Sequence, residues 1–165
     1  MKILLAISVL AFFTLSSCGD KKPASPHDSA IGKQMAVRYG RPYKKGRVIF
    51  GGLVPYGQVY RCGADSATTV TFDQDATFGG KPVKAGTYTL FVIPNEKTWT
   101  VILNSQLGQW GAFDYEKYKD KDVLHVDEPV KTLDQPIEQL TISLPASSLV
   151  IEWDNVQVTV PVSFP

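Results

Sequence analysis

The chain has 165 residues, of which 44% are hydrophobic and 20% are charged, a composition typical of one globular domain. Its 17 Lys and Arg nearly balance its 16 Asp and Glu. This balance gives no support to a nucleic-acid partner or to an acidic tail that binds cationic partners. The only cysteines are Cys18 and Cys62.

The first residues have the pattern of a secretory signal. Lys2 precedes a largely apolar run over residues 3–15, which is shorter than the roughly 20 apolar residues that a membrane-spanning helix needs. The run ends in Leu15-Ser16-Ser17-Cys18, which resembles the bacterial lipobox, in which the cysteine carries a diacylglycerol. We therefore predict a signal peptide over residues 1–17 and lipidation of Cys18. The alternative is ordinary signal cleavage beside an unmodified cysteine.

The segment after Cys18 is polar and contains Pro23 and Pro26, without hydrophobic periodicity. We interpret residues 18–29 as a flexible membrane tether and residues 30–165 as a single domain. Lipidation would leave Cys62 as a lone thiol, so an intramolecular disulfide is excluded. The predicted location is the cell envelope, with the domain lipid-anchored to a membrane, the outer membrane or the periplasm, and with the membrane leaflet left open.

Short stretches of alternating or continuous apolar residues predict strands along most of the domain. Residues 86–94 are apolar on both faces, which favours a central strand, and Asn95-Glu96-Lys97 turns that strand into the next one as a hairpin. Asp154-Asn155 is read as a tight turn between the last two strands. The predicted strands cover residues 35–39, 47–54, 68–72, 86–94, 98–104, 123–126, 139–144, 148–153 and 156–162.

Only residues 111–121 read as helical. The fold class that follows is all-β, an antiparallel β-sandwich or barrel-like jelly roll with at most one short helix. We expect the core between two sheets to contain Tyr88, Phe91, Trp99 and Trp153 with the aliphatic residues of the strands.

Several ordered motifs resemble one bacterial family, domain-of-unknown-function family 2911, over about Ser25 to the C-terminus. The motifs are Arg41-Pro42 with Gly46-Arg47, Phe50-Gly51, Pro55-Tyr56-Gly57, Tyr60-Arg61 with Gly63-Ala64, Ala85-Gly86-Thr87-Tyr88 and Trp110-Gly111. The resemblance implies a lipoprotein or secreted protein of the Bacteroidetes kind, and it implies no activity, because the family has none established. Relatives more often read Trp-Arg-Thr-Gly-Ala-Asn-Glu, so Tyr60, Cys62, Asp65 and Ser66 depart from the family pattern.

The sequence gives only weak support for a catalytic function. Cys62 follows Arg61, but no base is in view, because His27 lies in the predicted tether and His125 in a predicted strand. His125, Asp127 and Glu128 offer too few ligands for a metal site, and the pairs Asp73/Asp75 and Asp120/Asp122 fit solvated turns. We predict no catalytic residue, metal or cofactor, and keep as the alternative an envelope hydrolase that uses Asp65, Asp114 or His125, with or without a metal.

The arginines point to binding. Arg38, Arg41, Arg47 and Arg61 fall close together, and Asp and Glu are absent between Ala30 and Ala64. Guanidinium groups bind carboxylates and phosphates through paired hydrogen bonds. The predicted ligand-binding residues are Arg41, Arg47, Arg61, Tyr39, Tyr56, Tyr60, Asp65 and Trp110.

Two alternatives stay open for these residues. The arginines could instead be structural, paired with carboxylates such as Asp65 or Asp114 or bonded to loop carbonyls. Trp110, Phe113, Tyr115 and Tyr118 could be core rather than a contact surface, which their spacing favours. The predicted role is a non-catalytic binding or scaffolding module for a glycan, a peptide or an envelope protein, joined to the membrane through its lipid anchor and without a nucleic-acid partner.

Overall fold

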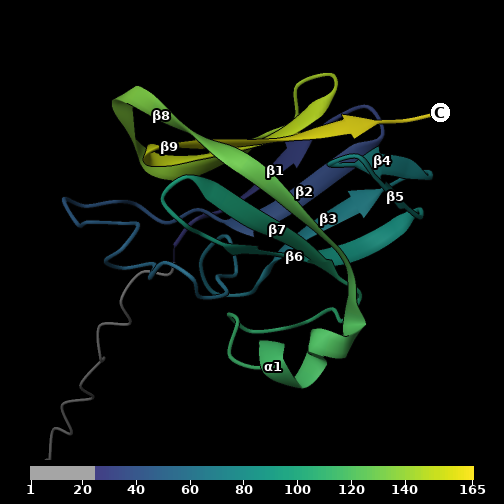
Figure 1. The fold of residues 1–165 in the computed structure, drawn as a ribbon, viewed down its shortest axis with the longest axis horizontal. Helices are drawn as coiled ribbons and strands as arrows, with labels where there is room; N and C mark the ends of the chain where they lie inside the picture. The colour runs from purple at the N-terminus through teal and green to yellow at the C-terminus, as the bar shows by residue number, and fades with distance from the viewer. Residues whose placement is uncertain (1–24) are drawn as a thin grey trace, which may run out of the picture.

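The computed structural model describes residues 25–165, so the predicted signal peptide, Cys18 and most of the predicted tether lie outside it. Within residues 25–165, nine strands, one helix and one 3-10 turn follow along the chain (Figure 1). They are β1 (His27–Ile31), β2 (Met35–Gly40), β3 (Thr68–Phe72), β4 (Ala76–Phe78), β5 (Lys81–Val83), β6 (Gly86–Ile93), β7 (Thr98–Asn104), α1 (Tyr115–Tyr118), η1 (Lys119–Lys121), β8 (Asp122–Ser143) and β9 (Ser148–Ser163).

The strands form one antiparallel sheet in the order β1-β2-β3-β6-β7-β8-β9-β4-β5, which confirms the all-β prediction. The long strands β8 and β9 let this sheet fold over itself, since β8 pairs with β7 along its first half and with β9 along its second. Figure 1 shows β9 and the second half of β8 lying as an upper layer over β2, β3, β6 and β7. The sheet is not closed, and none of the helices in residues 25–165 is long and apolar enough to span a membrane.

Alternation along the strands places a large apolar core between the two layers. Val37 of β2, Val70 of β3 and Leu90 of β6 are fully buried there. Trp99 and Trp153 come from opposite layers, and both meet the ring of Phe50 edge to face at centroid distances of 4.8 and 6.2 Å.

A smaller cluster lies on the outer face of the sheet. Phe91 of β6 and Ile102 of β7 pack there against Tyr115 of α1, with Phe91 and Tyr115 edge to face at 5.2 Å. This explains why β6 is buried on both faces, as its sequence predicts. Phe91 itself belongs to this outer cluster, so its predicted place in the main core is wrong.

Three strand predictions need correction. Residues 47–54 form turns rather than a strand, because Gly51 adopts a positive φ of 80° and Val54 folds back to hydrogen-bond Ile49. The stretches 123–126 and 139–144 are two parts of the one long strand β8. Asp154, with φ of 54°, interrupts the regular pairing inside a continuous β9 instead of forming a hairpin turn with Asn155.

The sheet begins earlier than expected. His27, Asp28 and Ser29 fall within the predicted tether, yet they form β1 and pair with β2. β1 is an exposed edge strand without a buried face of its own, so its sequence is polar and shows no alternation from which a strand could be predicted.

Candidate functional site

One row of polar side chains crosses the outer face of the sheet. Residues directly opposite one another in antiparallel neighbours share a face, so the strand register defines the row. It runs from β1 to β8 through Ser29, Arg38, Thr69, Thr89, Asn104 and Asp122. The sequence does not reveal this row, because its members are spread over six strands between residues 29 and 122 and only the register of the sheet aligns them.

The half of the row toward β8 is covered by the segment that follows β7, and its side chains form hydrogen bonds to that segment and to one another. Thr89 donates to the carbonyl of Gln106 at 2.6 Å, and Asn104 donates to the Asp122 carboxylate at 2.7 Å and to the carbonyl of Tyr118 at 2.8 Å. Thr89 and Asn104 are fully buried under the segment that follows β7. This half therefore binds the 105–121 segment to the sheet and is closed to a ligand.

The half of the row toward β1 is open and lies in a groove of about 610 Å³. Ser29, Arg38 and Thr69 form its floor across three neighbouring strands. The groove is lined by His27, Asp28, Ser29, Arg38, Tyr39, Gly40, Ser66, Ala67 and Thr69. Its donors and hydroxyls suit a polar ligand of small size.

Trp110 borders this groove. The amide of Ala67 donates to the carbonyl of Gln109 at 3.0 Å, and the amide of Gly111 donates to that of Asp65 at 3.0 Å. This pattern makes Ser66 and Trp110 a non-hydrogen-bonded pair, the kind whose side chains lie closest on one face. Ser66 lines the groove, and Trp110, 60% exposed, is its cross-strand neighbour just outside the lining.

Arg38 is the cation of the groove. Its side chain is exposed, and within residues 25–165 no hydrogen bond or ion pair ties its guanidinium to another side chain or carbonyl. The other charges have partners: His27 lies 3.5 Å from the Asp65 carboxylate, and Asp28 pairs with Arg41 at 3.3 Å. Arg38 is therefore free to bind an anionic group, which a guanidinium holds through two parallel hydrogen bonds.

Two of the predicted ligand-binding arginines are used by the fold. Arg41 donates to the carbonyl of Leu140 at 3.1 Å and to the hydroxyl of Thr141 at 3.0 Å, besides pairing with Asp28. Arg47 donates to the carbonyls of Tyr43 and Lys44. The structural alternative therefore applies to both, although the carboxylate partner of Arg41 is Asp28 rather than Asp65 or Asp114.

Arg61 differs, because its buried Nε has no hydrogen-bond partner among the described residues, and its guanidinium lies 5.8 Å from the Tyr60 ring centroid. The predicted tyrosines separate into different settings. The buried hydroxyl of Tyr39 accepts from the amide of Ile142 at 3.0 Å, and burial raises its pKa. Tyr60 donates to the carbonyl of Gly63 at 2.6 Å, and burial likewise raises its pKa.

Tyr56 lies away from the groove, in a second cleft beside the β6–β7 turn. Of the predicted residues, only Tyr39 is among those that line the groove. Asp65 and Trp110 lie beside it, Asp65 next to the lining residue His27 and Trp110 opposite the lining residue Ser66. Sequence reasoning missed Arg38, although it counted it in the arginine cluster, and it missed His27, Ser29 and Thr69. Strand alternation alone could have placed Arg38 on the outer face, opposite the buried Val37 and Tyr39.

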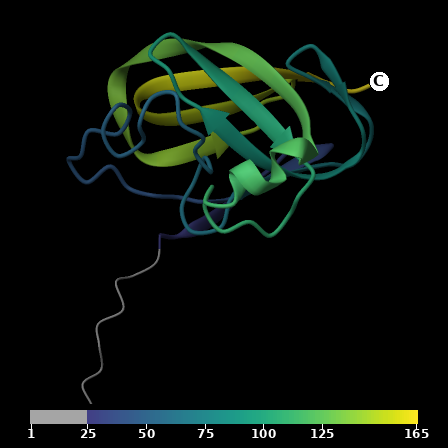
Figure 2. The same cartoon turned by 60° about the horizontal axis from the view of Figure 1, so that its bottom comes forward.

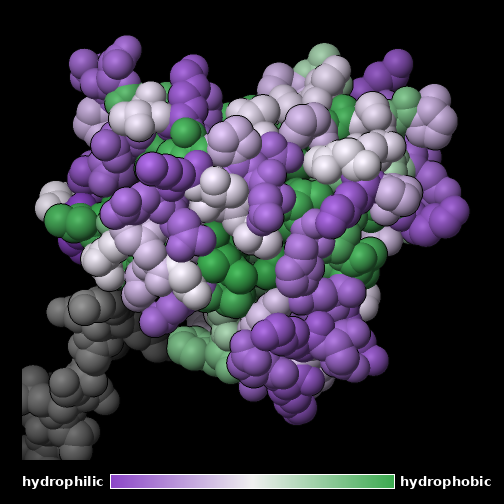
Figure 3. Space-filling model, viewed as in Figure 1, coloured by the Kyte–Doolittle hydropathy of each residue, from purple (hydrophilic) through white to green (hydrophobic). Residues whose placement is uncertain are grey.

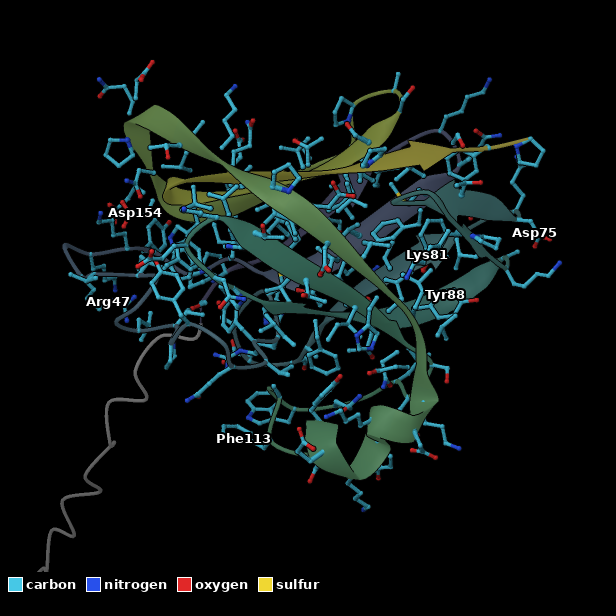
Figure 4. The ribbon with its side chains drawn as sticks, viewed as in Figure 1. Arg47, Asp75, Lys81, Tyr88, Phe113 and Asp154 are labelled. Carbon is cyan, nitrogen blue, oxygen red and sulfur yellow. The ribbon has the colours of Figure 1, made fainter. Side chains whose placement is uncertain are left out.

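The aromatic segment 110–118 divides between core and surface. Tyr115 is buried as its spacing predicts, but Trp110 and Phe113 are 60% and 80% exposed. In Figure 3 a pale green patch beside the hydrophilic surface of α1 coincides with the position of Phe113 in Figure 4.

The chemical groups weighed for catalysis are held in structural roles. Cys62 is fully buried, and burial raises the pKa of its thiol to about 12, so the thiolate is absent near neutral pH. His125 approaches the Asp122 carboxylate at 2.8 Å, but that carboxylate also accepts from Tyr115 at 2.6 Å and from Asn104. Across residues 25–165 no three His, Cys, Asp or Glu side chains gather as metal ligands.

These observations define an all-β domain with an open polar groove on the outer face of its folded sheet. The chain belongs to the family described as "Protein of unknown function (DUF2911)", whose sequence profile matches residues 23–162. Neither a curated protein nor a solved structure matches the chain.

Proposed function

We propose that this domain is a non-catalytic binding module of the cell envelope, and that its groove holds an acidic glycan. The open half of the polar row carries the proposal: Arg38 stands between Ser29 and Thr69, with the exposed ring of Trp110 at the edge. A carboxylate-bearing sugar needs a guanidinium for its charge, hydroxyl partners for its own hydroxyls and an aromatic ring for its apolar face. A volume of about 610 Å³ has room for one or two sugar residues.

The proposal is tested by titrating the full chain with an oligogalacturonate, an acidic probe, and with a neutral dextran oligosaccharide of equal length. We expect binding of the acidic probe by calorimetry and much weaker binding of the neutral one. Arg38→Gln should weaken acidic binding at least about tenfold, because a hydrogen bond to a charged group is worth about 1.5–3 kcal/mol. Trp110→Ala should weaken it through lost stacking, by a factor on the order of ten.

The matched control is Lys131→Gln, which removes an exposed charge on β8 outside the groove. It should leave the affinity unchanged. Equal affinity for both probes, or an equal loss in Arg38→Gln and Lys131→Gln, would reject the groove as an acidic-glycan site.

A further inference from the structure

Charge is distributed unevenly along this chain. Of the 16 Asp and Glu, only Asp20 and Asp28 precede residue 65, whereas residues 30–64 alone hold seven Lys and Arg. Most of this positive segment is the β2–β3 loop, residues 41–67, which the groove uses only at its end. A nearly neutral protein thus carries one cationic loop, in which Asp65 is the only acidic residue. Two further carboxylates reach the loop from outside: Glu138 accepts from the amide of Lys45, and Asp154 pairs with Lys44.

Part of this charge stays unneutralised at the tip of the loop. Lys44 forms an ion pair with Asp154. Among the residues that the structure describes, Arg47 binds only carbonyl oxygens, which leaves its positive charge without a carboxylate partner there. Lys45 is exposed, and no carboxylate of residues 25–165 pairs with its ammonium group. Figure 4 shows Arg47 at the left end of the molecule, well away from Phe113.

The same tip exposes apolar side chains. Val48 is 71% exposed, Leu53 48% and Tyr43 41%. They are exposed on an ordered scaffold, because the buried Ile49 accepts a 2.8 Å hydrogen bond from the amide of Val54, which is also buried. Apolar and aromatic side chains mixed with cations are the composition of segments that lie at a bilayer interface.

The chain outside the structure leaves from the base of this loop. The amide of Arg41, the first residue of the loop, donates to the carbonyl of Pro26 at 2.7 Å. Cys18, the predicted site of lipidation, is eight residues before Pro26, so at most about 29 Å of chain separates the two. A lipid at Cys18 would therefore hold the β2–β3 loop close to the membrane surface.

We propose that the tip of the β2–β3 loop docks onto an anionic phospholipid bilayer. Lys45 and Arg47 would face the headgroups, while Tyr43, Val48 and Leu53 would enter the interface. Each cation near an anionic surface adds attraction that salt weakens. This inference goes beyond the proposed function and uses no residue assigned to bind the glycan, so either can fail without the other.

The test is hydrogen exchange of the full chain reconstituted in two kinds of vesicle, phosphatidylcholine alone and phosphatidylcholine with one third phosphatidylglycerol. Any anchor is the same in both, so a difference in the loop reports docking of the loop itself. We expect amides of residues 43–54 to exchange at least about threefold more slowly on the anionic vesicles. High salt should remove this protection.

The double variant Lys45→Glu/Val48→Ser should lose the protection. The matched control, Lys119→Glu/Phe113→Ser, makes the same two kinds of change at two exposed residues away from the loop and should keep the protection. Equal exchange on both vesicles, or equal protection in the two double variants, would overturn the inference. Protection by a soluble polygalacturonate without vesicles would overturn it as well, since the loop would then recognise an anionic polymer.

Discussion

At the scale of single residues, the shape of the groove depends on Gly40, which has no side chain. A Cβ at Gly40 would lie 2.1 Å from the carbonyl oxygen of Ala64, so only glycine lets β2 approach the turn before β3 this closely. Within that turn Cys62 and Asp65 adopt positive φ values of 51° and 62°. The turn that places Ser66 in the groove is thus held in a conformation that most residues avoid.

Glu128 gives a prediction of pH dependence at this scale. It is partly buried, and burial together with the Asp127 charge raises its pKa above the ordinary 4.5. The folded state therefore holds this proton more tightly than the unfolded state, so its contribution to stability declines as pH rises through the window above 4.5. We expect Glu128→Gln to be more stable than the wild type at pH 7.

Urea unfolding between about pH 3.5 and 7.5 measures this effect. The stability difference between Glu128→Gln and the wild type should shrink as pH falls and vanish below the ordinary pKa of the carboxyl. Glu96→Gln, in the exposed β6–β7 turn, serves as the control and should show no such trend. A difference that is constant with pH would contradict the prediction.

At the scale of elements, α1 is too short to be stable alone, since isolated helices need about 12 residues or more. Its position comes from Tyr115, whose ring packs on Phe91 and whose hydroxyl donates to the Asp122 carboxylate at 2.6 Å. The same carboxylate meets His125 on β8. Figure 2 shows α1 lying across the outer face of the sheet, which these contacts explain.

We therefore predict that Tyr115→Phe lowers the free energy of unfolding by about 1.5–3 kcal/mol, the value of a hydrogen bond to a buried charge. Tyr118→Phe is the control on the same helix, because Tyr118 contributes its backbone carbonyl to the network. Chemical denaturation measures both. An equal effect of the two substitutions would show that the hydroxyl of Tyr115 does not position α1.

At the scale of the whole molecule, a seam joins the two layers where the sheet stays open. Tyr39, Arg41 and Lys44, at and after the end of β2, bond to the second half of β8. Tyr43 and Gln139 form an isolated bridge in the same place. The seam thus holds the upper layer on the lower one without a continuous ladder of strands. Two of the predicted ligand residues, Tyr39 and Arg41, take part in it.

Tyr39→Phe tests the seam. Loss of the buried hydroxyl leaves the amide of Ile142 without its partner, so we expect a loss of about 1–3 kcal/mol in unfolding free energy. Tyr43→Phe should cost much less, because Tyr43 is 41% exposed and its hydroxyl makes no hydrogen bond within residues 25–165. Glycan binding in the groove should persist in both variants under conditions where they are folded. Similar stability losses in the two variants would refute a special role for the seam.

Local sequence patterns were sufficient for the regular part of the fold. Alternation predicts β2, β3 and the β6–β7 hairpin, because each of these strands buries one face or both against a neighbour. It fails for β1, whose side chains are mostly exposed, and for the bend at Asp154, where one positive φ inside a strand looks like a turn. Hydrophobic alternation along a strand reflects the burial of its side chains. It therefore cannot predict a strand in which burial does not alternate from one residue to the next.

By itself, then, the sequence determined the all-β class, the central hairpin and the family. It also singled out the cationic segment before residue 65, since charge can be counted without coordinates. Only the tertiary structure decided which arginines are free. Arg41 finds Asp28, Leu140 and Thr141 across the seam, whereas Arg38 remains open between Ser29 and Thr69. The physical reason is that partners come from strands up to a hundred residues apart, and only the register of the folded sheet brings them together.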